Sequence, residues 1–164
     1  MKISVRKAGL SELDLLMEWR MQVLAEVFSD YENVDWETLR KNNEDYYKEH
    51  LADGTHTACF AMDTEQERIV GCGGICYQKE MPSPDNLSGT NAYLMNIYTL
   101  PEYRGGGIGR KIVEFLLSDA EQKGTEKIYL ESSDPAKGLY RELGFTEMKD
   151  YMKLQRNQDE SACK

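Results

Sequence analysis

The sequence predicts an α/β fold in which a mixed, mostly antiparallel central sheet is flanked by helices. Three observations support this. Short apolar or alternating segments recur along the chain, two helix-like patterns stand together in its first half, and helix-like and strand-like patterns alternate in its second half. Strands joined by turns pair antiparallel, whereas a helix between two strands favours a parallel pair, so the combination predicts a mixed sheet.

The first half begins with a strand and two helices. Alternating apolar residues in 2–6 predict the strand. Ser11 is the expected N-cap of a helix whose apolar stripe runs to Val27, and acidic residues in its first turn suit the helix dipole. A second helix is expected over 36–51 with Asp35 as its N-cap.

Three strands then follow. The first is expected over 55–62 and, after a polar turn at 63–68, its partner over 69–78. Three glycines in that partner indicate a bulge or close packing. A loop with two prolines, 79–89, leads to an apolar strand over 92–100.

The remaining elements alternate between helix and strand. A helix is expected from 107 or 108 to about Gln122, with Gly124 as the residue that ends it. A strand over 127–131, a short helix over 135–143 and a terminal strand over 145–154 complete the order β-α-α-β-β-β-α-β-α-β. Without a linker or repeat, we expect one domain over 1–155 and a polar tail over 156–164.

Composition limits the classes of protein. Among 164 residues the formal net charge is −9, which argues against binding to nucleic acid or to an anionic membrane. No apolar run reaches the length of a membrane span, and residues 1–7 lack the apolar core of a signal peptide. Two histidines and four cysteines without metal-ligand spacing predict no metal site and reduced thiols, as in a cytoplasmic protein.

The most informative segment is the glycine-dense turn between the strand at 92–100 and the helix that follows. It reads Leu-Pro-Glu-Tyr-Arg-Gly-Gly-Gly-Ile-Gly-Arg-Lys over 100–111. The first turn of a helix offers backbone amides without intrahelical partners, and glycines let a ligand approach them closely. With Arg104 and Arg110 on either side, the turn predicts a site for a phosphate or pyrophosphate.

Glycine spacing narrows the kind of phosphate ligand. The dinucleotide pattern G-x-G-x-x-G and the P-loop pattern G-x-x-x-x-G-K-[ST] both fail here, which disfavours a Rossmann or P-loop nucleotide-binding domain. The remaining pattern, Arg104-x-x-Gly107-x-Gly109, resembles the pyrophosphate loop of the GNAT superfamily of acyl-CoA-dependent N-acetyltransferases. Residues 136–145, with Leu-Tyr-Arg-Glu-Leu-Gly-Phe, resemble a second signature of that family and stand in the family's order.

The resemblance implies a GNAT-like fold and a site for acetyl-CoA, without a metal. Backbone groups at the end of the central strand would hold the pantetheine arm and polarise the thioester carbonyl, while the loop amides would hold the pyrophosphate. Ser133 stands where many members carry an asparagine that contacts pantetheine, and this chain departs from the family pattern there. The residues expected to bind the cofactor are Ile97, Tyr98, Thr99, Arg104, Gly105, Gly106, Gly107, Ile108, Gly109, Arg110 and Ser133.

The resemblance also implies two catalytic side chains. Tyr140 matches the tyrosine that commonly protonates the departing thiolate, although a packing role is the alternative. Glu131 is the nearest match to the glutamate that some members use as a general base, and a solvated acid at a strand end is the alternative. Asn96 stands where others carry an acid, and an ordered water is a further option. Cys72 and Cys76 are expected in the core rather than in an acyl-enzyme.

The expected function is therefore transfer of an acetyl group from acetyl-CoA to an amine within a ternary complex. The acceptor is left open between a small molecule and a peptide, and a homodimer is also left open. The aromatic and acidic segment 28–43 either walls the acceptor site, where it would attract an ammonium group, or is an ordinary amphipathic surface. The alternative function is a non-catalytic acyl-CoA-binding sensor.

Overall fold

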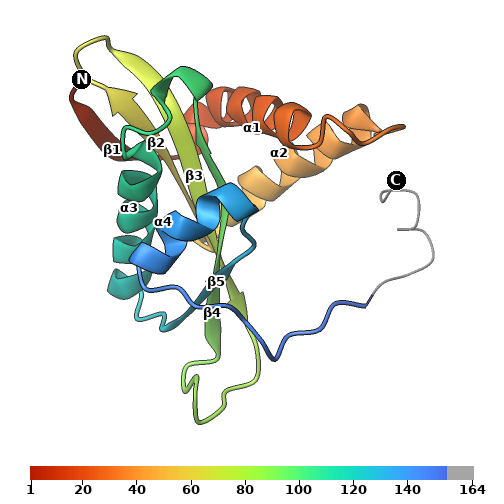
Figure 1. The fold of residues 1–164 in the computed structure, drawn as a ribbon. Coiled ribbons are helices and arrows are strands. Elements are labelled where there is room, and N and C mark those ends of the chain that lie inside the picture. Colours follow the sequence, from red (N-terminus) through yellow and green to blue (C-terminus); the bar gives the residue numbers. More distant parts are fainter. Residues whose placement is uncertain (155–164) are drawn as a thin grey trace.

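The sheet predicted from the sequence is present and has five strands. The computed structural model describes residues 1–154. Its strands lie in the order β1-β2-β3-β4-β5; neighbours are antiparallel except β4 and β5, which are parallel (Figure 1). The strands are β1 (Ile3–Ala8), β2 (His56–Asp63), β3 (Arg68–Lys79), β4 (Thr90–Thr99) and β5 (Lys127–Leu130).

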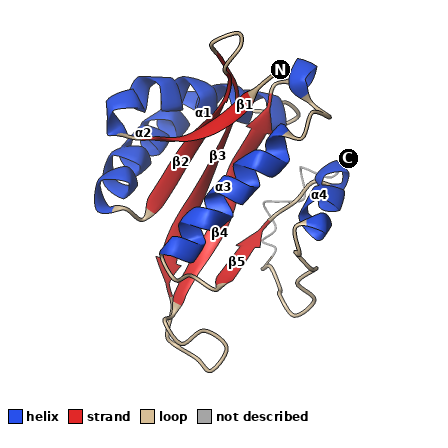
Figure 2. Ribbon diagram, turned by 90° about the vertical axis from the view of Figure 1, so that its left-hand side faces the viewer, coloured by secondary structure: helices blue, strands red, loops and turns tan. Residues whose placement is uncertain are grey.

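Helices cover both faces of this sheet (Figure 2). Helices α1 and α2 pack together on one face, and α3 crosses the other face with α4 beside it. Their bounds are α1 (Leu13–Val27), α2 (Trp36–Asp53), α3 (Ile108–Gln122) and α4 (Lys137–Glu142).

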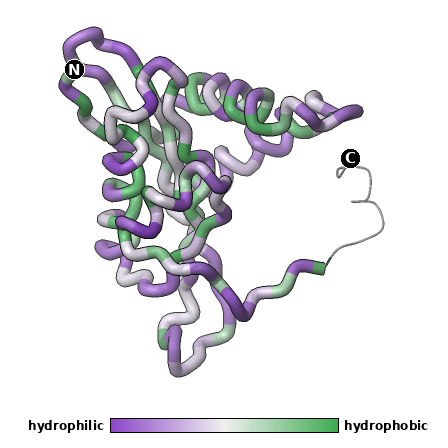
Figure 3. The backbone as a smooth tube through the Cα atoms, viewed as in Figure 1, coloured by the Kyte–Doolittle hydropathy of each residue, from purple (hydrophilic) through white to green (hydrophobic). Residues whose placement is uncertain are grey.

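Each face therefore has its own hydrophobic core. The core under α3 contains Ile75, Ile112 and Leu116, all with no measurable exposure. The core under α1 and α2 contains Met17 and Phe60 with their neighbours. Figure 3 shows that hydrophobic stretches follow the strands and α3, whereas the turn between β2 and β3 is hydrophilic.

Most helix and strand predictions are confirmed, and two are wrong. Ser11 does not cap α1, because a short 3-10 helix (Leu10–Glu12) comes first and the N-cap is Glu12, whose side chain makes no capping bond. The strand expected over 145–154 does not form, so β5 remains at the edge of the sheet. By contrast, the carboxylate of Asp35 accepts a bond from the Thr38 amide at 3.0 Å, as expected of an N-cap.

A bulge in the middle of the sheet shapes the site. The register between β3 and β4 shifts between Cys72 and Gly74, opposite Asn96, which has a left-handed φ of 57°. A side chain at Gly73 would meet Ile112 of α3 at 2.4 Å, so this glycine also permits close packing. Both readings of the glycine-rich strand are confirmed.

The strands β4 and β5 separate just before this bulge. Their pairing runs only from Asn91 with Lys127 to Leu94 with Leu130, and β5 ends there. Residues 95–99 of β4 therefore continue beyond β5 with no strand beside them on that edge, among the residues that the structure describes. This leaves a fork that opens toward the glycine turn.

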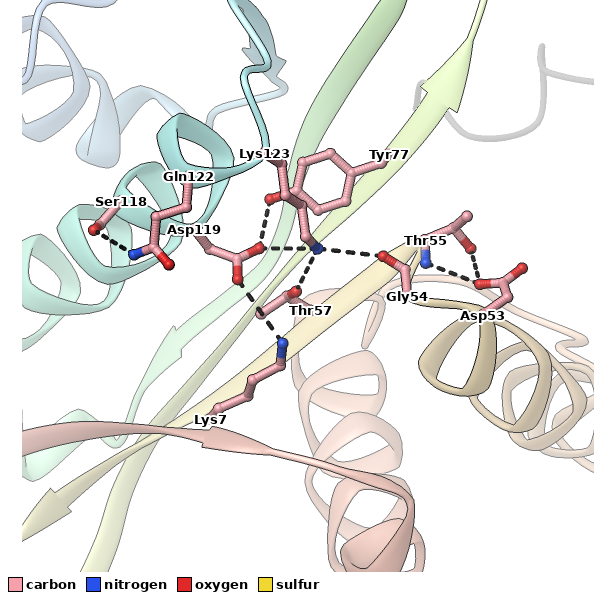
Figure 4. A network of polar contacts seen from close by, with 10 residues as sticks. All are labelled: Lys7, Asp53, Gly54, Thr55, Thr57, Tyr77, Ser118, Asp119, Gln122 and Lys123. Atoms are coloured by element: carbon pink, nitrogen blue, oxygen red, sulfur yellow. Dashed lines mark hydrogen bonds and ion pairs between the residues drawn. The ribbon is translucent and has the colours of Figure 1, made fainter.

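A polar network joins the end of α3 to strands β2 and β3 (Figure 4). Asp119 accepts a hydrogen bond from the Tyr77 hydroxyl at 2.6 Å and pairs with Lys123 at 3.1 Å. Lys123 in turn donates to Thr57 at 3.1 Å and to the carbonyl of Gly54 at 3.2 Å. Burial would raise the pKa of Asp119, but its bonds from Tyr77, Thr57 and Lys123 together lower it.

We expect Asp119→Asn to lower the free energy of unfolding by about 2 kcal/mol at pH 7, because a partly buried carboxylate with several partners loses its charge. The lowered pKa of Asp119 means that this contribution is present above the unfolded pKa and is lost as pH falls through the folded one. Urea unfolding at pH 7 and pH 3 measures both effects. In the control Asp134→Asn, on an exposed pair with Lys137, stability stays within about 0.5 kcal/mol. Equal stability losses in the two variants would contradict this role of Asp119.

Candidate active site

The glycine turn joins β4 to α3 through two left-handed residues. A short 3-10 helix (Pro101–Tyr103) follows β4, and then Gly105 and Gly107 have φ of 81° and 75°. Only glycine takes such angles without a steric cost. Gly107 is the N-cap of α3, and no atom lies within 4 Å of the side chain that either glycine lacks. The turn is therefore open on the side that these glycines face.

The backbone amides of this turn are available to a ligand. The first amide of α3 with a helical partner is that of Lys111, which donates to the carbonyl of Gly107 at 3.2 Å. The amides of residues 105–110 donate to no atom of residues 1–154. Ile108 buries its side chain in the core, so only its backbone faces the turn. Free amides at a helix N-terminus are suited to binding an anion.

The two arginines of the motif have partners within the protein. The guanidinium of Arg104 pairs with Glu26 of α1 at 2.8 Å and donates to the carbonyl of Thr99 at 3.1 Å. Arg110 pairs with Glu142 of α4. The positive charge expected beside the turn is thus largely compensated by these carboxylates, and the backbone amides are the donors that the turn leaves free.

At the end of β4 the side chains pack inside the protein, while one edge of the backbone stays unpaired within residues 1–154. The Tyr98 side chain is buried and its hydroxyl donates to Glu26, while Ile97 packs against the core under α3. Thr99 leads directly into the glycine turn. The backbone edge of 95–99 faces the fork beside β5, so a linear ligand can pair with it as an added strand.

Tyr140 lies in α4, which packs against the start of α3. A side chain at Gly109 would lie 3.4 Å from Leu139, the neighbour of Tyr140. Tyr140 lines a cavity of about 490 Å³ together with Leu130 and Ser132. Its hydroxyl makes no hydrogen bond within residues 1–154, and burial raises its pKa. A phenol that is still protonated above neutral pH suits a proton donor.

The other two residues expected from the resemblance lie just beyond β5. Glu131 follows Leu130 directly and is exposed, at the point where the fork begins. Ser133 is exposed and is the N-cap of a short 3-10 helix (Asp134–Ala136). Its neighbour Ser132 lines the cavity instead.

A second cavity, of about 240 Å³, adjoins the bulge on the opposite face of the sheet. Sequence reasoning missed it, because its residues come from α1, α2, β2 and β4 and carry no common motif. From the segment 28–43, only the last two residues reach this cavity, whereas Tyr31 and Trp36 are exposed elsewhere. The lining residues are Arg20, Asn42, Asn43, Tyr46, Tyr47, His56, Met95 and Asn96.

His56 is the buried histidine of this cavity, and the Tyr46 hydroxyl lies 3.0 Å from its Nδ1. Burial lowers the pKa of His56 from 6.5 to about 4, so the ring is neutral at pH 7. The side chains of Tyr46 and His56 are therefore both neutral, and His56 adds no second positive charge to the cavity that Arg20 lines.

This burial predicts a pH-dependent loss of stability. Because the unfolded state takes up the proton first, the contribution of His56 is complete above pH 6.5 and is lost as pH falls toward 4. We expect a loss of about 3 kcal/mol across this range. Urea unfolding between pH 7 and pH 4 measures it, and His56→Gln flattens the curve. An unchanged slope in this variant would contradict the assignment.

The structure confirms that Cys72 and Cys76 lie in the core, as predicted. Cys59, Cys72 and Cys76 are buried free thiols, and Cys163 lies outside the described residues. Burial raises the pKa of Cys72 to about 12, so its thiolate is not available for an acyl-enzyme. Within residues 1–154, no three acidic, histidine or cysteine side chains are grouped to hold a metal ion, and no helix is long and apolar enough to span a membrane.

Known proteins resemble this chain in both sequence and structure. Glucosamine 6-phosphate N-acetyltransferase of Trypanosoma brucei brucei is 29% identical over 87 residues, which cover 53% of this chain and 57% of that protein. Thialysine N-epsilon-acetyltransferase of Mus musculus is 42% identical over 60 residues, 35% of each chain. The matches thus span between about a third and just over half the length of these curated relatives.

The structural match extends over almost the whole chain. A predicted acetyltransferase from Clostridium acetobutylicum, solved with acetyl-CoA, has a TM-score of 0.82 and 25% identity, with 94% of this chain and 96% of that chain covered. The sequence model of the acetyltransferase (GNAT) family matches residues 20–145, which is more than half of the chain. The chain therefore belongs to the GNAT family of acetyltransferases.

Proposed function

We propose that this protein transfers an acetyl group from acetyl-CoA to an amine within a ternary complex. The observation that supports this most strongly is the continuity of two free backbone surfaces. The edge of β4 over residues 95–99 leads through Thr99 into the free amides of residues 105–110. A pantetheine arm followed by a diphosphate has the shape and charge to fit them in that order.

The cofactor supplies an activated acetyl thioester. In our proposal, the amides of Gly105, Gly106, Gly107, Ile108, Gly109 and Arg110 hold the diphosphate. Backbone groups of Ile97, Tyr98 and Thr99 orient the thioester and donate to its carbonyl oxygen. Arg104 contributes mainly by fixing Thr99, since its guanidinium donates to the Thr99 carbonyl. Ser133 lies at the rim, because its neighbour faces the cavity.

The proposed proton transfers use two groups near the fork. Tyr140 donates its phenolic proton to the departing thiolate, and Glu131 takes a proton from the amine directly or through water. The position of Glu131 supports this role, since it follows the last residue of β5 that pairs with β4. The acceptor reaches the thioester from the cavity beside the bulge, which Met95 and Asn96 of β4 line.

The test combines binding and turnover. Calorimetry measures the affinity for coenzyme A, and a thiol reagent measures coenzyme A release from acetyl-CoA with a panel of amines. The panel includes glucosamine 6-phosphate, thialysine, an alanyl peptide and an aminoglycoside, which match acceptors named for relatives and structural neighbours. We expect amine-dependent thiol release. Binding of coenzyme A without release across the panel would favour the acyl-CoA sensor instead.

A further inference from the structure

We propose that the acceptor is a small amine that also carries an anionic oxyacid group, a carboxylate or a phosphate, and that Arg20 binds this group in the cavity beside the bulge. The inference rests on the proposed function, because it concerns the acceptor of the same reaction. It starts from a cation that has no acidic partner in an otherwise acidic protein.

The cavity has a single charged side chain. Among its eight lining residues only Arg20 is ionised at neutral pH, since the others are amides, tyrosines, a methionine and a neutral histidine. The chain as a whole carries a net charge of −9, yet none of the carboxylates of residues 1–154 lines this cavity. The cavity therefore selects for negative charge although the protein as a whole does not.

The partners of Arg20 are both neutral. Its Nε donates to Oδ1 of Asn43 at 2.9 Å, and its Nη1 donates to Oδ1 of Asn96 at 3.0 Å. Within residues 1–154, Nη2 has no hydrogen-bond partner and Arg20 is in no ion pair. Arg20 is partly buried, and guanidinium groups removed from water are normally matched by carboxylates, because desolvation of an unmatched charge is costly. Here the two amides orient the guanidinium and leave one of its nitrogens for a ligand.

A second donor converges on the same cavity. The Tyr47 hydroxyl has no hydrogen-bond partner in the described part of the chain, although its side chain is 4% exposed and lines the cavity. Burial raises the pKa of Tyr47 to about 12, so the hydroxyl keeps its proton and can donate. Guanidinium and phenol donors together suit an oxyanion, and guanidinium groups bind carboxylate and phosphate in a planar fork.

The position of the anion relative to the reaction follows from Asn96. This residue has φ 57° at the bulge of β4, one residue before Ile97, and it also accepts the bond from Arg20. An anion held by Arg20 thus lies next to the strand segment that orients the thioester. The volume of about 240 Å³ has room for a short acceptor. Such an acceptor would place its amine in the fork and its anion on Arg20.

The experiment compares matched amines that differ only in the anionic group. O-phosphoethanolamine is paired with ethanolamine, and β-alanine with β-alaninamide. Calorimetry with the protein saturated with coenzyme A measures binding, and thiol release measures kcat/KM. We expect the anionic member of at least one pair to exceed its neutral partner at least tenfold, and the pair with the larger ratio identifies phosphate or carboxylate as the group.

Two variants separate ligand binding from a structural role of Arg20. Asn43→Asp places a carboxylate oxygen where Nε of Arg20 now donates at 2.9 Å. The charge of the guanidinium is then compensated within the protein, while its hydrogen bonds to residues 43 and 96 remain. We expect the preference for the anion to fall to about twofold or less while the protein stays folded. Loss of the bond from Nδ2 of Asn43 to the Leu39 carbonyl, now 2.8 Å, lowers the melting temperature. Arg20→Lys keeps the charge but loses the planar guanidinium group, and we expect this variant to retain only part of the preference for the anion. Arg40→Gln, at an exposed position of α2, is the control and keeps the full preference.

Each outcome decides the proposal. Equal binding of both members of both pairs by the wild type, or a preference that survives Asn43→Asp, would overturn it. If coenzyme A binds but no amine is acetylated, the proposed reaction fails, and the calorimetric comparison still decides whether Arg20 binds an anion. Acetylation of neutral or dicationic amines alone, such as putrescine, would support the reaction and reject the anionic acceptor.

Discussion

Gly107→Asp is expected to reduce the affinity for coenzyme A at least a hundredfold, which is about 3 kcal/mol. Gly107 caps α3 with φ 75°, and its amide belongs to the free set that we assign to the diphosphate. A carboxylate there would lie within a few ångströms of the ligand's negative charges. At an effective dielectric constant near 20, like charges about 4 Å apart repel by about 4 kcal/mol.

The choice of aspartate separates electrostatics from folding. Aspartate and asparagine tolerate the left-handed region better than other residues with a side chain, and no atom within 4 Å would clash with a Cβ at this position. Gly107→Asn is therefore the matched control, with nearly the same shape and no charge. We expect calorimetry to show only a few-fold loss for asparagine. Similar affinities of the aspartate variant and the wild type would reject the assigned diphosphate site.

The strands and helices were predictable where the local pattern and the tertiary structure agree. The Asp35 cap, the glycine turn and the end of α3 near Gly124 all depend on local chemistry that the sequence displays. Two expectations failed because tertiary context decided them. Ser11 lies inside a 3-10 turn that begins at Leu10, and residues 145–154 do not pair with the edge of β5.

The candidate site likewise has one part that the sequence reveals and one part that only the folded structure reveals. Its backbone part is contiguous in sequence from Ile97 to Arg110, so a motif could reveal it. Arg20 belongs to none of the motifs in the sequence. Its relation to Asn43 and Asn96 exists only after α1, α2 and the bulge of β4 come together. The pairing of Arg104 with Glu26 was hidden for the same reason.

Tyr140→Phe is expected to lower kcat about a hundredfold while the affinity for coenzyme A changes less than about twofold. The hydroxyl has no partner in the described residues, so its loss leaves no protein group unsatisfied. The ring still packs edge-on against Phe145, with centroids 5.8 Å apart, and folding is preserved. Because burial raises the pKa of Tyr140, the wild-type phenol remains a proton donor throughout the neutral range.

The comparison with Tyr129→Phe makes this test specific. Tyr129 lines the same cavity from β5, and its ring packs in a tilted arrangement against Tyr93 with centroids 5.1 Å apart. Its variant therefore removes a hydroxyl from the cavity wall without changing α4. Steady-state thiol release should give a kcat within about twofold of the wild type for Tyr129→Phe. A thiolate leaves unaided only if it is already stable as an anion, so acyl donors with more acidic thiols should recover part of the Tyr140→Phe loss. Equal kcat losses in both variants, or no recovery with such donors, would mean that the Tyr140 hydroxyl does not protonate the leaving group.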